Sequence, residues 1–170
     1  MTATLLDLPA VRTSLWVSSY GKETQAGGQA SVPVSGTMST DLAYIVRIFL
    51  PTPCVIARFY WANGATASTN TVQVGIYNDD LSAFLRGTAT TASGASALQF
   101  DNVTDTMIPS GRYWMALVVN GTTTTLQRAN SATLRFGSIY NMAAARPLPT
   151  TLVPAASAGV HPMFGFTQIA

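Results

Sequence analysis

RYWMALVV, residues 112–119, is apolar on both faces of an extended chain, and this feature decides the fold. Because successive side chains of a strand point to opposite sides, Trp114, Ala116 and Val118 share one face. A strand with two apolar faces needs a core on one side and a further cover on the other. Trp114 is then either a filler beneath that cover or an exposed contact residue. The opposite face carries Tyr113, Met115, Leu117 and Val119.

Three further segments alternate with the same period of two and have ordinary strand length. They are LAYIVRIFL at 42–50, CVIARFYWA at 54–62 and TVQVGIYND at 71–79. The residues predicted to share a face are, segment by segment, Leu42, Tyr44, Val46, Ile48 and Leu50; Val55, Ala57, Phe59 and Trp61; Val72, Val74 and Ile76. Weaker strand candidates are 15–19, 30–34, 83–90, 97–102, 124–129, 133–138 and 163–169.

Turn residues separate these segments, for example Asn78-Asp79-Asp80 and Asn120-Gly121. One glutamate and one lysine leave little for helices that face solvent, whereas Thr, Val, Tyr, Phe and Ile favour strands. The sequence therefore predicts an all-β fold, a single antiparallel β-sandwich of jelly-roll type that spans residues 15–170.

Two segments do not fit a compact sandwich. Residues 1–14 form an apolar N-terminal arm around Pro9, and residues 141–162 form a long Pro/Ala-rich loop before the last strand, with four prolines. A long loop in a small domain is usually disordered or functional, but this one has leucines and almost no charge. We expect both segments to pack as extended arms, either on this sandwich or on a neighbour.

Composition points to an assembly. Charged residues make up 9% of the chain and hydrophobic residues 48%, whereas about 25% charged residues is typical. A surface of Thr, Ser, Ala, Asn and Gln has few charged groups that must lose their water when it docks, so we expect a component of an assembly. The alternative is a stable extracellular β domain.

The net charge of +2 and the singly scattered arginines predict no nucleic-acid partner. No apolar run is long enough to span a membrane, and the first residues do not resemble a secretory signal.

Residues with catalytic or metal-binding chemistry are few. Cys54 lies alone in an apolar run and is predicted to be a buried, inert thiol, and His161 is the only histidine. The pairs Asp79/Asp80 and Asp101/Asp105 fit structural turns better than paired acid–base catalysis, and the segment with Asp101 and Asp105 could instead supply oxygens to an irregular calcium site. We therefore predict no catalytic residue, no metal ligand and no cofactor.

The chain resembles β-sandwich modules of tailed-bacteriophage virions, which occur in capsid decoration proteins, head fibres and tail-fibre ends. The resemblance covers residues 42–170. It rests on VQVGIYND, then IPSGRYWMALVVNG some thirty residues later, a Pro-rich ARPLPTTL loop and a final PMFGFTQIA strand. It implies that the PSG-Y-W unit is the turn into a central strand. The family is functionally mixed, so the resemblance carries over no site residue.

The resemblance implies a non-enzymatic virion protein, and two roles compete. The short arm before the first strand favours a small capsid-decorating or head-fibre component that binds the major capsid protein or another virion protein. The alternative is a receptor-binding or glycan-binding tail-fibre module that contacts a host surface glycan. The low charge predicts a homo-oligomer, and the resemblance implies a trimer. The interface candidates are Leu5, Leu6, Leu8 and Trp16.

Overall fold

The computed structural model describes residues 16–18, 34–38, 42–66, 69–91, 94–130, 140–143, 147–153, 156–157 and 160–169. All regular structure in these ranges is β-strand, and no helix in them is long and apolar enough to cross a membrane. The strands are β1 (Trp16–Ser18), β2 (Val34–Thr37), β3 (Leu42–Leu50), β4 (Cys54–Ala62), β5 (Thr71–Asn78), β6 (Phe84–Thr91), β7 (Leu98–Ile108), β8 (Gly111–Val119), β9 (Thr125–Asn130), β10 (Tyr140–Ala143), β11 (Ala156–Ser157), β12 (Val160–Pro162) and β13 (Phe164–Ile169).

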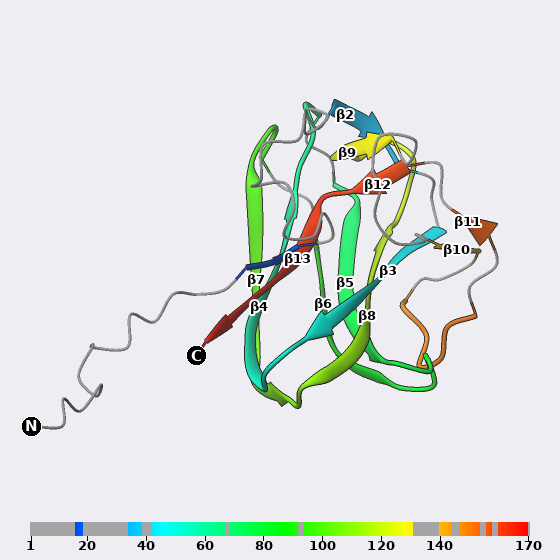
Figure 1. Ribbon diagram of the computed structural model, residues 1–170. Helices are drawn as coiled ribbons and strands as arrows, with labels where there is room; N and C mark the ends of the chain where they lie inside the picture. Colours follow the sequence, from blue (N-terminus) through cyan, green and yellow to red (C-terminus); the bar gives the residue numbers. More distant parts are fainter. Residues whose placement is uncertain are drawn as a thin grey trace, which may run out of the picture.

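The strands form three antiparallel sheets (Figure 1). A four-stranded sheet has the order β1-β13-β4-β7, a six-stranded sheet has the order β11-β10-β3-β8-β5-β6, and β12-β9-β2 lie across one end. The chain crosses between the two larger sheets at the β3–β4, β4–β5, β6–β7 and β7–β8 connections. In the six-stranded sheet β3 pairs with β8, and in the four-stranded sheet β4 pairs with β7. The predicted all-β fold of antiparallel sheets is confirmed; the jelly-roll type stays a prediction.

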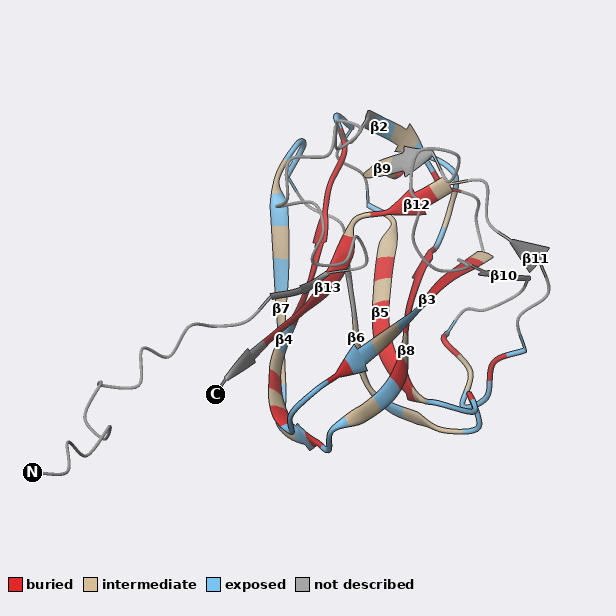
Figure 2. Cartoon of the chain, viewed as in Figure 1, coloured by how far each residue is buried: buried red, intermediate tan, exposed pale blue. Residues whose placement is uncertain are grey.

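The two larger sheets face each other across a shared apolar core (Figure 2). The faces predicted for 42–50, 71–79 and 112–119 are confirmed, because alternate side chains of β3, β5 and β8 meet β4 and β13 there. Burial of these side chains is the main stabilising contribution to such a fold, at roughly 25 cal/mol per Å² of apolar surface. The core residues from β5 and β8 are Val72, Val74, Ile76, Tyr113, Met115, Leu117 and Val119.

Strand β4 departs from strict alternation, so the predicted face is wrong at its start. The sequence places Val55 and Ala57 with Phe59 and Trp61, but both are only half-buried, and Ile56 lies in the core instead. The pairing of β4 with β7 shifts register directly after Ile56. A bulge adds a residue to one strand, and a shift of one residue moves side chains to the opposite face.

The outer face of the six-stranded sheet carries a second apolar cluster. Ala116 and Val118 of β8 lie in it together with Leu148 and Leu152 of the Pro-rich segment 147–153. The predicted cover on the second face of 112–119 is thus a segment of the same chain. For residues 147–153, the choice between this sandwich and a neighbour is settled in favour of this sandwich.

Three hydrogen bonds fasten segment 147–153 along β5 and the turn after it. The Leu148 N–H donates to Gln73 Oε1 at 2.8 Å, and the Tyr77 hydroxyl donates to the Pro149 carbonyl at 2.7 Å. The Leu152 N–H donates to the backbone carbonyl of Leu81 at 3.0 Å. The polar groups in these three bonds therefore have partners, and burial raises the pKa of the Tyr77 hydroxyl above its ordinary value.

The region 141–162 is not one continuous loop as predicted. It contains most of β10, which pairs with β3, and the short strands β11 and β12. Pro162 lies in β12, which is an edge strand of the three-stranded sheet. Proline has no backbone N–H to donate, so within sheets it is tolerated on edge strands such as this one. The sequence did not predict these strands, because each is very short and shows no alternation of apolar and polar residues.

Candidate interaction surface

Two residues with nucleophilic or acid–base chemistry, Cys54 and His161, lie inside the fold. Cys54 is buried, as predicted, and burial raises the pKa of its thiol, which disfavours the reactive thiolate. His161 is also buried, in β12, where its backbone pairs with Ala129 of β9. Neither side chain lies at the surface.

The turn prediction for Asp79/Asp80 is confirmed. Asn78 Oδ1 accepts the Ala83 N–H at 2.9 Å, and Asp80 Oδ1 accepts both the hydroxyl of Ser82, at 2.6 Å, and its N–H, at 3.0 Å. The hydroxyl bond, with the N–H bond, lowers the pKa of the Asp80 carboxyl. These contacts close the connection between β5 and β6.

Asp101 and Asp105 lie in a strand, β7, and not in a turn. Asp101 is half-buried, and burial raises the pKa of its carboxyl. Within the described ranges, no three His, Cys, Asp or Glu side chains come together as a possible metal site. The absence of metals and cofactors from function stays a prediction.

The predicted interface residues are only partly placed. Leu5, Leu6 and Leu8 lie outside the described residues. Trp16 begins β1, and its backbone pairs with Thr167 at one edge of the four-stranded sheet. Their role in anchoring stays a prediction.

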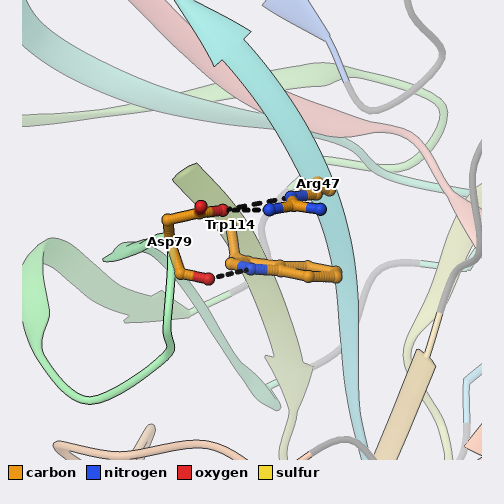
Figure 3. Close-up of polar contacts among 3 residues, drawn as sticks. All are labelled: Arg47, Asp79 and Trp114. Atoms are coloured by element: carbon orange, nitrogen blue, oxygen red, sulfur yellow. Dashed lines mark hydrogen bonds and ion pairs between the residues drawn. The ribbon is translucent and has the colours of Figure 1, made fainter. Parts of the chain in front are cut away.

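Arg47, Asp79 and Trp114 form a surface group that the sequence did not suggest (Figure 3). The Arg47 guanidinium lies 5.5 Å from the centroid of the Trp114 ring, and its Nε–H donates to Asp79 Oδ1 at 3.1 Å. The Trp114 Nε1–H donates to the backbone carbonyl of Asp79 at 2.8 Å. Arg47 therefore stacks on the indole, ties β3 to the β5–β6 turn, and covers one face of Trp114.

Trp114 fills part of the covered face, which is one of the two predicted roles. It is half-buried, packs against the cluster beneath segment 147–153, and has the Arg47 guanidinium over its ring. Its role as an exposed contact residue stays a prediction. On the same face, Phe49 of β3 lies directly opposite Arg112 of β8, and both are exposed. The outer face of the six-stranded sheet is therefore covered only in part, because Phe49 and Arg112 stay exposed on it.

Asp79→Asn is expected to lower the free energy of unfolding by less than about 1 kcal/mol, because the Arg47 and Asp79 side chains are each 46% exposed. Urea unfolding at low salt, repeated in about 1 M NaCl, checks this, since the salt should remove the difference. A larger loss that persists in high salt would mean that the pair holds the turn in place by more than surface attraction.

Two signals in the sequence could have pointed to the outward position of Arg47 and Phe49. Arg47 and Phe49 alternate with the core residues of their strand, so both were bound to face outward. A phenylalanine at an outward position of a strand is unusual for a solvated face. The contact between Arg47 and Asp79 left no local signal in the sequence, because 32 residues separate the two.

Comparison with known proteins adds no relative: no family model matches this sequence, and no curated protein matches it significantly.

Proposed function

We propose that this chain is a non-enzymatic structural protein of a bacteriophage virion. In this role it is a small capsid-decorating or head-fibre component that docks on the particle through the major capsid protein or another virion protein. It self-associates and needs no cofactor. The trimeric state follows only from the resemblance to virion modules.

One observation carries the proposal: Cys54 and His161 are buried inside the fold, while large apolar side chains face outward. Phe49 is 66% exposed, Met107 65% and Val153 73%. Exposed aromatic and aliphatic side chains on a charge-poor surface are typical of docking surfaces, because their burial requires little loss of charge hydration.

The alternative is a receptor-binding or glycan-binding tail-fibre module. A sugar platform needs an open aromatic ring. Of the two tryptophans whose side chains the structure describes, Trp61 is fully buried and Trp114 has Arg47 over its ring, so these two favour the docking role over sugar binding.

Electron microscopy of intact particles tests the proposal. Many symmetric copies on the head are expected for a decoration protein, whereas a few copies at the tail end would support the adhesion role. A preparation of particles from which the protein is absent altogether would contradict both.

Deletion of residues 1–14 is expected to leave the sandwich folded but to abolish its attachment to particles. An apolar arm laid on a neighbour buries surface at roughly 25 cal/mol per Å², so its loss removes most of the docking energy. Co-sedimentation of the purified variant with particles measures attachment, and far-UV circular dichroism controls for folding. If the truncated, folded protein still attaches as the full chain does, the anchoring role of the arm is wrong.

A further inference from the structure

We propose that Asn120, in the connection between β8 and β9, is a site of spontaneous deamidation in the folded protein, whereas Asn63 is protected from this reaction. Each of the two asparagines precedes a glycine, and these are the two Asn-Gly pairs of the chain. The pairs are alike in the sequence, but their surroundings in the structure differ. The reaction needs only water, so it does not depend on the proposed virion role.

Deamidation begins when the backbone nitrogen of Gly121 attacks the side-chain carbonyl carbon, Cγ, of Asn120. The new N–Cγ bond closes a succinimide ring, and the Cγ–Nδ2 bond breaks. Its electron pair and the proton of the Gly121 nitrogen leave with the amide group as ammonia. Water then adds to one of the two ring carbonyls, and the ring opens to aspartate or to isoaspartate. A glycine after the asparagine favours the attack, because it has no side chain to hinder it.

Asn120 is exposed and lies directly after the last residue of β8. Its own N–H donates to the Thr71 carbonyl at 2.9 Å, which fixes the backbone on the side away from the reaction. The next residue, Gly121, has a φ of 94°, which glycine adopts without strain. A Cβ there would also lie 2.7 Å from the side-chain amide of Asn70. The turn therefore requires the same glycine that makes Asn120 reactive.

Asn63 has the opposite surroundings, since it is only 2% exposed. Its Oδ1 accepts the Trp61 Nε1–H, and its Nδ2 donates to Gln99 Oε1, each at 3.0 Å. The nitrogen that would attack, that of Gly64, donates to the Thr125 carbonyl at 2.7 Å. Both reacting groups are therefore fixed, and the ring can close only after a local opening that breaks these bonds.

Peptide mapping by mass spectrometry, after incubation of the full chain in mildly alkaline buffer, measures both sites. Alkaline buffer speeds the reaction, because the attacking nitrogen must lose its proton. In the folded chain we expect Asn120 to convert about tenfold faster than Asn63 or more, since the opening that Asn63 needs costs free energy. In concentrated urea, where the fold holds neither site, we expect similar rates.

The product has two signatures. Deamidation of Asn120 replaces a neutral amide with a carboxylate, so the formal net charge falls from +2 to +1 and ion exchange separates the product from the parent chain. Isoaspartate at position 120 identifies the succinimide, because direct hydrolysis of the side-chain amide gives only aspartate. Asn120→Gln keeps an amide but lengthens the side chain by one methylene, which disfavours ring closure, and should abolish the acidic product. Thermal unfolding confirms that this variant is folded.

Three results would overturn the inference. If Asn120 converts in urea but stays intact in the folded chain, the turn protects it. Equal rates at Asn120 and Asn63 in the folded chain would show that the contacts of Asn63 give no protection. An acidic product that contains aspartate but no isoaspartate would exclude the attack by the Gly121 nitrogen.

Discussion

Replacing Trp61 with alanine is expected to lower the free energy of unfolding by about 3–5 kcal/mol, a large fraction of the roughly 5–15 kcal/mol that holds a domain folded. Trp61 is fully buried in the core between the two larger sheets. Its Nε1–H also donates to Oδ1 of Asn63 at 3.0 Å, and Asn63 Nδ2 donates to Gln99 Oε1 at 3.0 Å. The change therefore leaves a cavity and removes the donor from a buried amide. Urea unfolding followed by circular dichroism measures the loss.

Two variants divide this effect into its parts. Trp61→Phe keeps most of the ring volume but removes the indole donor to Asn63 Oδ1. We expect it to lower the free energy of unfolding by about 1–3 kcal/mol, which is less than the loss in the alanine variant. Met107→Ala, at a side chain that is 65% exposed, should change the stability by no more than about 0.5 kcal/mol. An alanine variant of Trp61 that unfolds like the Met107 control would contradict the position of Trp61 in the core.

Leu148→Ala and Leu152→Ala are each expected to lower the free energy of unfolding by about 2–5 kcal/mol. Both side chains are buried, at 6% and 4% exposure, although they belong to a segment without regular structure. They cover Ala116 and Val118 on the outer face of β8, so their truncation also opens that cluster to water. Urea unfolding measures the loss, and limited proteolysis should show faster cleavage within 147–153.

Thr151→Ala is the matched control for Leu152, because it changes an exposed neighbour in the same segment and should stay within about 0.5 kcal/mol of the wild type. Tyr77→Phe removes only the hydrogen bond to the Pro149 carbonyl, so a smaller loss of about 0.5–1.5 kcal/mol is expected. If both leucine variants matched the Thr151 control, segment 147–153 would not be a structural cover of the sheet.

The fold class was predictable because strand formation leaves a local signal. Val72, Val74 and Ile76 repeat at a spacing of two, and this spacing alone puts them on one face of β5. The interface candidates of the N-terminal arm lie outside the described residues, so their prediction remains to be tested. Strand β4 shows the limit of the local signal, since its bulge depends on how β7 pairs with it.

The sequence by itself determined that residues 112–119 form a strand with two apolar faces, because an extended chain must alternate its side chains. It also determined a surface poor in charge. Only the tertiary structure decided that segment 147–153 covers the second face, and that Arg47 meets both Trp114 and Asp79, which are far from it in the chain. The physical reason is that such contacts depend on strand order and pairing register, which arise from the packing of the whole chain and leave no trace in local composition.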